Sequence, residues 1–377
     1  MSEVRIVIVQ DYVPEYRKSF FNLLNKELQK LNMSSELVLD KKTVSLNRNG
    51  DSAITDLETV MVGSFTLNLG IGQIRLRKVS RKEFTADLVI VEQAAKNISS
   101  WIIILIRKLL RKPTALWGHG VDYVNIGNSL SSALRKHMIK VASHILVYSS
   151  GAEEKLILQG VPPVKITNVQ NSTDTLELNR KLSQITVEQR ENFMLASHLS
   201  TNLILFLGSL DANKNLDLLF AASEVAHEIE PSLTLAIVGD GPLRQYVEQQ
   251  VSRRSWIRYL GRNEETKLLA LASAKAIVIP GRVGLVATDS IASGVPVVTV
   301  QHSLHAPEFE YLSKNENCLI SKDSPRELGA KIIEAIARDS QILAQKAALR
   351  DLPKYSTEQM VNNFTLGIER AIGSYRV

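Results

Sequence analysis

Cysteine is almost absent from this sequence, since Cys318 is the only one among 377 residues. A single thiol excludes a disulfide within the chain and any zinc site built from cysteines, and it fits a reducing compartment. Long apolar runs are absent as well: residues 101–106, WIIILI, fall far short of a membrane-spanning helix. The start of the chain has no signal-peptide layout. We therefore expect a soluble or peripheral protein of the cytoplasm.

Several ligand signatures are also missing. The chain has neither a GxGxxG turn with a ribose carboxylate nor a GxxxxGK[ST] loop, which disfavours dinucleotide-binding and P-loop folds. His302 and His305 lie close together, but no acidic or thiol set accompanies them, so no metal site is predicted. The basic stretch of the chain lacks interleaved aromatics, and no helix-turn-helix or RNP pattern is evident, so we expect no nucleic-acid partner.

The net charge of +6 is unevenly distributed. Residues 1–175 contain 23 Lys/Arg and 16 Asp/Glu, whereas the remainder contains 22 and 23. The excess is densest over residues 75–112, with ten basic and three acidic residues. Such a surplus favours an anionic partner, and we expect peripheral contact between the N-terminal domain and an anionic membrane. A solvated basic surface without a partner is the alternative.

Buried-strand patterns followed by helical patterns recur in two series, beginning at Val4 and at Leu203, with a polar segment at 175–189 between them. At this length two domains are expected. The predicted fold class is α/β, with two Rossmann-like doubly wound parallel sheets that face each other across a ligand-binding cleft. The expected domains are an acceptor-binding domain at 1–175, a nucleotide-sugar-binding domain at 176–355, and a helix at 356–377 bracing the first domain.

The second domain is organised around residues 276–300, AIVIPGRVGLVATDSIASGVPVVTV, which read as strand, loop, helix and strand. A helix beginning at Gly284 would direct the backbone N–H groups of Gly284, Leu285 and Val286 at an anion. Asp289, about one and a half turns further on, could reach a hydroxyl beside that anion. This arrangement suits a nucleotide or nucleotide-sugar, and a purely structural βαβ unit is the alternative.

In the first half, polar residues follow two strands. Tyr16 and Arg17 follow the strand at 4–9 and are candidates for a phosphate or acceptor contact, or else surface residues at a helix start. His119 lies between two glycines after the strand at 114–117, where a ligand could approach the bare backbone closely. A helix at about 98–111 has Trp101, Ile102, Leu105 and Leu109 and the basic Arg107, Lys108, Arg111 and Lys112. We expect its apolar face to pack on the sheet and leave open a membrane contact at its basic end.

Six motifs occur in order and at characteristic separations: WGHG (117–120), ITNVQNSTD (166–174), LGSLDANKN (207–215), IVGDGPLR (237–244), YLGR (259–262) and PGRVGLVATDSIASGVPVV (280–298). Together they resemble the retaining GT-B glycosyltransferases of family 4, glycosyltransferase group 1, over nearly the whole chain. The resemblance implies that Lys214 binds the donor diphosphate, that Asp289 binds the nucleotide ribose and that His119 touches the donor sugar. The other donor-side candidates are Ser209, Gly241, Arg262, Arg282, Gly284, Leu285 and Val286.

Three positions depart from the family pattern. Ser209 stands where family members usually have an arginine, Gly281 replaces the first of two paired glutamates, and Asp289 shortens the second. Loss of one cation from a diphosphate site should cost a few kcal/mol unless it is replaced, and we expect Arg282 to replace it.

The resemblance implies a retaining, metal-independent hexosyltransferase that uses a UDP-sugar or GDP-sugar as donor and needs no cofactor. We expect a lipid-linked or glycan acceptor, in cell-surface polysaccharide biosynthesis at the inner face of the plasma membrane. Two alternatives remain: a catalytically weak GT-B subunit that binds a partner, and a GT-B sugar-nucleotide epimerase.

Overall fold

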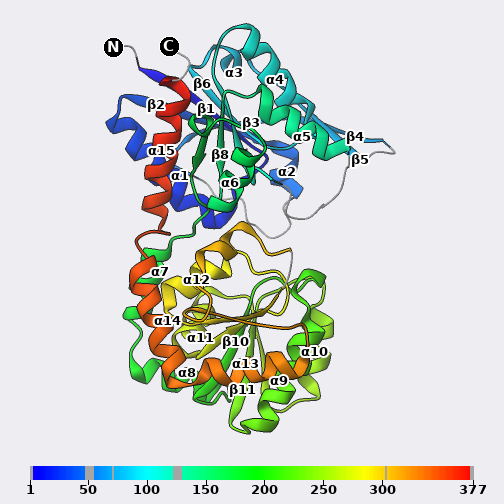
Figure 1. The fold of residues 1–377 in the computed structure, drawn as a ribbon, viewed down its shortest axis with the longest axis vertical. Coiled ribbons are helices and arrows are strands. Elements are labelled where there is room, and N and C mark those ends of the chain that lie inside the picture. The colour runs from blue at the N-terminus through cyan, green and yellow to red at the C-terminus, as the bar shows by residue number, and fades with distance from the viewer. Residues whose placement is uncertain (1–2, 47–54, 70–71, 122–129, 302–303, 374–377) are drawn as a thin grey trace. The chain divides into compact units, whose positions relative to one another are not determined.

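The computed structural model describes residues 3–46, 55–69, 72–121, 130–301 and 304–373. The chain forms two compact units (Figure 1). Unit 1 comprises Met1–Thr173 and Thr357–Val377, and unit 2 comprises Asp174–Ser356. The chain therefore leaves unit 1 once and returns to it for the last helix.

Unit 1 is built on a seven-stranded parallel sheet of order β3-β2-β1-β6-β7-β8-β9. The inner strands are continuous aliphatic runs because helices cover both faces of the sheet. The order reverses between β1 and β6. The strands are β1 (Val4–Gln10), β2 (Met33–Asp40), β3 (Glu58–Val62), β6 (Leu88–Glu92), β7 (Thr114–Gly118), β8 (His144–Val147) and β9 (Ile166–Asn168).

The last helix of the chain belongs to the core of unit 1. The Phe364 ring lies 4.8 Å from Trp117 and 5.2 Å from Phe20, centroid to centroid. Figure 1 shows this helix, α15, alongside α1. The helices of unit 1 are η1 (Glu15–Arg17), α1 (Lys18–Lys30), α2 (Lys41–Leu46), α3 (Arg81–Thr85), α4 (Ile98–Leu109), α5 (Leu130–Val141), α6 (Ser150–Leu158), η2 (Pro163–Lys165) and α15 (Thr357–Gly373).

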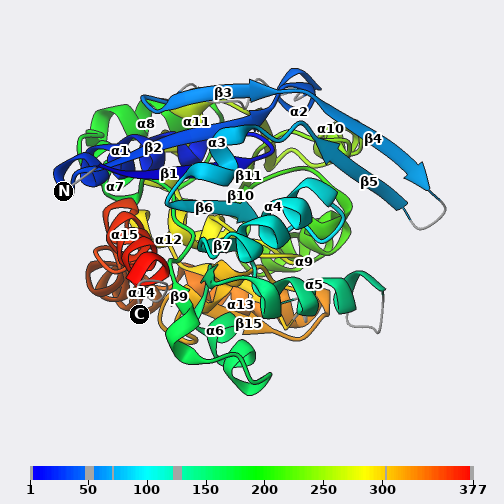
Figure 2. The same ribbon diagram turned by 90° about the horizontal axis from the view of Figure 1, so that it is seen from above.

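An antiparallel hairpin of β4 (Ser64–Leu69) and β5 (Gly72–Arg77) projects from unit 1 (Figures 1 and 2). Residues 58–69 form two strands, since the chain divides there into β3 and β4 around Gly63. The short helix α2 precedes this region and begins directly after β2. Asp40 accepts hydrogen bonds from the Lys42 N–H and the Thr43 hydroxyl, and this cap explains the helix. Residues 47–54 lie outside the described ranges.

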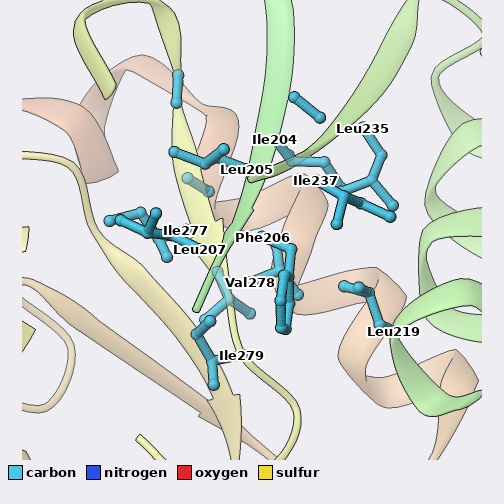
Figure 3. Close-up of a cluster of buried hydrophobic side chains, with 14 of the residues drawn as sticks. Ile204, Leu205, Phe206, Leu207, Leu219, Leu235, Ile237, Ile277, Val278 and Ile279 are labelled. Atoms are coloured by element: carbon cyan, nitrogen blue, oxygen red, sulfur yellow. The ribbon is translucent and has the colours of Figure 1, made fainter. Parts of the chain in front are cut away.

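Unit 2 contains a six-stranded parallel sheet of order β12-β11-β10-β13-β14-β15. Figure 3 shows the aliphatic side chains of β10, β11 and β13 packed together, with Phe206 against Leu219. The predicted α/β class with two parallel sheets is confirmed. The strands of unit 2 are β10 (Asn202–Leu207), β11 (Leu233–Val238), β12 (Ile257–Gly261), β13 (Ala276–Val278), β14 (Val297–Val300) and β15 (Cys318–Ser321).

The polar segment at 175–189 is helical. The Asp174 carboxylate caps α7 by accepting from the Glu177 N–H, and Thr186 and Gln189 form a capping box at α8. The helices of unit 2 are α7 (Thr175–Ser183), α8 (Val187–Ala196), η3 (Ala212–Lys214), α9 (Leu216–Ile229), α10 (Arg244–Ser252), α11 (Glu264–Ser273), α12 (Val286–Ser293), η4 (Pro307–Tyr311), α13 (Pro325–Ile336) and α14 (Arg338–Asp351).

The packing expected for helix α4 is wrong in part. Leu105 and Leu109, which we expected to pack on the sheet, are exposed, whereas Arg107, expected at an open basic end, is fully buried. The reason is that the Arg107 guanidinium donates to the carbonyl oxygens of residues 83, 86, 87 and 113, which turns this side of the helix inward. None of the helices within the described ranges combines the length and hydrophobicity needed to cross a membrane.

Candidate functional site

The strand order of unit 2 reverses between β10 and β13, which are neighbours at the centre of the sheet. The loops that follow two such strands run to helices on opposite faces, and the crevice at their carboxyl ends is the usual ligand site of open α/β sheets. In unit 2 these loops are residues 208–215 and 279–285. They contain most of the donor-side positions selected from the sequence.

Lys214 lies in the loop after β10, at the end of the turn η3. The Asp211 carboxylate caps this turn by accepting from the Asn213 N–H at 2.8 Å. The Lys214 Nζ atom donates to the Arg282 carbonyl oxygen at 2.7 Å, which ties the two loops together. Burial lowers the pKa of Lys214, the nearby Arg282 cation lowers it further, and Asp211 opposes both. The Lys214 ammonium has three N–H donors, and one of them binds the Arg282 carbonyl oxygen. Such a desolvated cation is suited to donate to a phosphate oxygen.

Gly281 is the point at which the two loops touch. A Cβ atom at this position would lie 2.1 Å from the Asn213 carbonyl oxygen and 2.6 Å from the Lys214 carbonyl carbon. The Arg282 N–H donates to the same Asn213 oxygen at 2.8 Å. A glutamate side chain at this position would therefore have no room, because the backbone of the Lys214 loop occupies its place.

Three consecutive backbone N–H groups lie at the start of α12. The helix begins at Val286 and not at Gly284 as predicted, although the Ala287 N–H already donates to the Gly284 carbonyl at 2.9 Å. Within the described part of the chain, the N–H groups of Gly284, Leu285 and Val286 have no acceptor. They are the unsatisfied donors of a helix N-terminus and favour an anion beside Lys214.

Asp289 lies in the first turn of α12 and is almost buried. Its Oδ1 atom forms an ion pair with the Nζ atom of Lys267 at 2.8 Å. Burial alone would lower the pKa of Lys267, but the adjoining Asp289 carboxylate raises it overall. The sequence analysis missed Lys267, because it lies on α11, in a different helix from the motif that contains Asp289.

The remaining donor-side candidates have different surroundings. The Ser209 hydroxyl donates to an Asp211 carboxylate oxygen at 2.5 Å. Gly241 packs against the loop after β10, since a Cβ atom there would lie 2.6 Å from the Leu210 carbonyl oxygen. Arg262 is exposed directly after β12. Gly241 thus shapes the loop that Ser209 belongs to.

In unit 1 the strand order reverses between β1 and β6, and Arg17 follows β1. Its Nη2 atom donates to the Tyr148 hydroxyl at 2.9 Å and to Asn171 Oδ1 at 3.1 Å. The guanidinium also lies over the Trp117 ring, 4.5 Å from its centroid. Arg17 is buried, so it ties together the carboxyl ends of β7, β8 and β9, whereas its neighbour Tyr16 is exposed.

Glu92 lies at the carboxyl end of β6, directly beside this reversal, and was not selected from the sequence. Its pKa is raised to about 7: burial and then the Asp11 carboxylate raise it, while the Asp11 backbone N–H, Arg17 and Arg75 act in the opposite direction. Arg75 forms an ion pair with Asp11. The carboxyl group can therefore gain or lose a proton near neutral pH. The only signal in the sequence is its position after the DLVIV strand.

His119 is exposed at the end of β7, and its ring packs edge-on against Tyr148, with 5.1 Å between centroids. Gln93 fixes the loop by accepting from the Gly120 N–H at 2.8 Å and donating to the Gly120 carbonyl at 3.1 Å. Gly120 has φ 71°, which favours glycine. His119 and Arg17 thus share the Tyr148 side chain as a neighbour.

In the portion of the chain that the structure describes, no group of three or more His, Cys, Asp or Glu side chains is arranged to hold a metal ion. The Nδ1 atom of His305 accepts from the Val283 N–H at 3.2 Å, so this histidine supports the loop before α12. His302 lies outside the described residues.

Comparison with known proteins identifies relatives of both the sequence and the fold. Residues 201–338 match the family model described as glycosyl transferases group 1. Over 103 residues the chain is 32% identical to glycogen synthase of Mycobacterium tuberculosis. This match covers 26% of this chain and 25% of that relative.

Solved structures match over nearly the whole chain. HepE of Anabaena in complex with UDP has 14% identity and a TM-score of 0.69, covering 97% of this chain and 99% of that one. A glycosyltransferase of Rickettsia africae has 15% identity and a TM-score of 0.68, covering 98% and 99%. The fold is therefore GT-B, and residues 201–338 of unit 2 are similar to the glycosyl transferases group 1.

Proposed function

We propose that the protein is a retaining glycosyltransferase that moves a sugar from a nucleotide-diphosphate donor to a hydroxyl-bearing acceptor. The observation that supports this proposal most directly is in unit 2. The Lys214 ammonium and the three N–H groups of residues 284–286 lie on adjoining loops at the reversal of the sheet. Both kinds of donor favour an anion, and a diphosphate presents oxygens enough for both.

In the proposed reaction, the bond between the anomeric carbon of the sugar and the diphosphate oxygen breaks, and a bond from that carbon to the acceptor oxygen forms on the same face. The acceptor proton passes to the leaving phosphate. Lys214 and the start of α12 stabilise the negative charge that grows on this phosphate as the bond breaks. The Arg282 side chain supplies a second positive charge, in place of the arginine that Ser209 replaces.

Asp289 binds a ribose hydroxyl in this proposal, and Arg262 lies beside the nucleobase. Gly241 supports the proposal through the shape of the loop after β10, against which it packs. The donor is a UDP-sugar or a GDP-sugar. UDP should be tested first, because the HepE structures contain UDP and UDP-glucose.

Unit 1 supplies the acceptor side. Tyr16 and Glu92 follow strands of unit 1 and offer hydrogen-bond donors and acceptors to the acceptor, and Arg17 holds their surroundings in place. His119, after β7, touches the donor sugar in this proposal. We propose a lipid-linked or glycan acceptor, in the synthesis of cell-surface polysaccharide at the cytoplasmic face of the membrane.

Thermal unfolding in the presence of UDP, GDP, ADP and their common sugar conjugates tests the donor site, with Lys214→Ala as the matched variant. A ligand at 100 times its Kd should add about 2.7 kcal/mol to the free energy of unfolding. We expect one diphosphate to stabilise the wild type and to have little effect on Lys214→Ala. If none stabilises the wild type, the donor site does not function.

The packing at Gly281 favours a second candidate, a GT-B chain that binds a partner and has little activity of its own, because no carboxylate can occupy that position. Absence of both donor binding and donor hydrolysis would support this candidate. The epimerase alternative is distinguished by turnover of the sugar nucleotide without any acceptor.

A further inference from the structure

Helix α4 exposes large apolar side chains while it buries polar ones, which is unusual for a helix on the surface of a globular protein. Its buried side contains Ile103 and Ile104 together with the polar Ser99, Ser100 and Arg107, all of them nearly inaccessible to solvent. Its exposed side ends in four large apolar residues within six positions. Their exposed fractions are 47% for Leu105, 37% for Ile106, 83% for Leu109 and 54% for Leu110.

The inward side of α4 is fixed by hydrogen bonds, so the helix cannot rotate to bury its leucines. The Ser99 hydroxyl donates to the Arg77 carbonyl at 2.9 Å and accepts from the Arg77 N–H at 2.6 Å. Arg107 donates to the Pro113 carbonyl at 2.7 Å and to the Ala86 carbonyl at 3.0 Å. Rotation would leave a buried guanidinium and several carbonyl groups unpaired, at a large cost.

Helix α5 extends this surface. It packs on α4 through the stacked rings of Trp101 and His137, 5.9 Å apart between centroids. Its exposed residues include Leu134, Lys136 and Lys140. Figure 1 shows the two helices side by side. We call this the α4–α5 surface; it consists of Leu105, Ile106, Leu109, Leu110 and Leu134 with the exposed cations Lys108, Arg111, Lys136 and Lys140.

The charge around the α4–α5 surface has one sign. Residues 93–152 contain eight Lys/Arg and a single acidic residue, Asp122, and neither α4 nor α5 contains an acidic residue. Two of the basic residues that precede this segment are neutralised by ion pairs within unit 1: Arg75 pairs with Asp11, and Arg77 pairs with Glu83. Lys108, Arg111, Lys136 and Lys140 are exposed on or directly after the two helices that contain the leucines.

We propose that the α4–α5 surface docks on the anionic face of a lipid bilayer, with its leucines in the interfacial region and its lysines and arginine against the lipid phosphates. An amphipathic surface with apolar side chains and a basic rim is what such an interface binds. A second copy of this chain is a poorer occupant, because a symmetric contact would bring the cations of both copies together. Nucleic acid would leave the leucines without an apolar partner.

Cosedimentation of the full chain with vesicles tests this proposal. We expect the wild type to pellet with vesicles of equal parts phosphatidylcholine and phosphatidylglycerol and to bind less to phosphatidylcholine alone. Lys108→Gln/Arg111→Gln should weaken binding to the mixed vesicles about tenfold or more, since each cation near such a surface contributes on the order of 1 kcal/mol. Lys26→Gln/Lys41→Gln removes two exposed cations elsewhere in unit 1 and should change little.

Leu109→Ser tests the apolar part, with Leu158→Ser as the matched control. Leu158 is 86% exposed at the end of α6, in the same unit, so both substitutions leave the core intact. Leu109→Ser should weaken binding about tenfold, and Leu158→Ser should leave it unchanged. Equal binding by wild type and Leu109→Ser overturns the proposal. So does a dimer in vesicle-free solution that Leu109→Ser abolishes, because the surface would then join two copies. UDP stabilisation of these variants reports on the donor site separately.

Discussion

The Nζ atom of Lys267 lies 2.8 Å from Asp289 Oδ1, and this ion pair holds the carboxylate proposed to bind the ribose. The pair joins two helices, α11 and α12, in a place that is only partly accessible to solvent. The position of Asp289 is thus fixed by a residue outside its own motif.

Replacement of Lys267 by Met should weaken UDP binding about tenfold, because the carboxylate loses the hydrogen bond that orients it. It should also lower the free energy of unfolding by about 1–2 kcal/mol. Titration calorimetry and urea denaturation measure these effects. Lys331→Met, which breaks the exposed pair with Glu334, serves as the control and should cost under about 0.5 kcal/mol.

A UDP analogue without ribose hydroxyls separates the role of Lys267 in binding from a general loss of structure. Wild type and Lys267→Met should bind this analogue equally well. A tenfold difference that persists with the analogue would show that Lys267 acts elsewhere in the donor site.

Arg282→Ala and Lys214→Ala should both reduce kcat, by about 10-fold and about 100-fold respectively, because each removes a positive charge from the leaving phosphate. Arg282→Ala keeps the backbone carbonyl to which Lys214 donates, so it tests the side-chain charge alone. If Arg282→Ala turns over normally, Arg282 does not supply the positive charge that is missing at Ser209.

The pH dependence of donor binding should reflect Lys214. Its pKa is lowered, so the ammonium loses its proton at a lower pH than an ordinary lysine. UDP affinity of the wild type should therefore decline as the pH rises through this range. In Lys214→Arg, the side chain stays charged, and the decline should be absent. Binding titrations from neutral to alkaline pH measure this; an equal decline in Lys214→Arg would assign it to another group.

Glu92 should make unit 1 less stable as the pH rises. Its folded-state pKa, about 7, lies above the ordinary value for glutamate, so the folded chain holds this proton more tightly than the unfolded chain does. This contribution is complete below about pH 4.3, the unperturbed value for glutamate, and is lost as the pH rises toward 7. The Tm of the wild type relative to Glu92→Gln should fall across this window, whereas Glu154→Gln, an exposed site in the same unit, should show no such trend.

Gly281→Ala should destabilise unit 2 by about 2 kcal/mol or more, because the new methyl group meets the backbone of the Lys214 loop. Gly63→Ala is the matched control, since a Cβ atom there has no neighbour within 4 Å. Chemical denaturation compares the two. Equal stability would mean that the loops can separate without cost, and that a carboxylate at position 281 is sterically allowed.

Most of the fold could be predicted from the sequence, because parallel strands buried on both faces are continuous aliphatic runs, such as residues 203–207 and 88–91. The helices α7 and α8 could not be recognised in the same way, since they are mostly polar and depend on the caps at Asp174 and Thr186. Hydrophobic periodicity also misplaced α4, because its orientation is set by the hydrogen bonds of Arg107.

The candidate site divides along similar lines. Lys214 and residues 284–286 could be selected from the sequence because each lies within a short motif in the loop between a strand and a helix. Lys267 and Glu92 were not, since their surroundings come from distant parts of the chain. The steric reason for Gly281 is equally non-local, because it depends on how closely two loops approach.

The return of the chain to unit 1 has a consequence during synthesis. Unit 2 is one continuous segment, whereas the core of unit 1 needs Met360, Phe364 and Ile368 of α15. As the polypeptide emerges from the ribosome, unit 2 can complete its core before unit 1 does. Although most of unit 1 is translated first, it still lacks α15 at that point. The core of unit 1 can therefore close over Phe20 and Trp117 only after α15 has left the exit tunnel. A chain truncated before residue 357 would have unit 2 complete and the core of unit 1 open to chaperones and proteases.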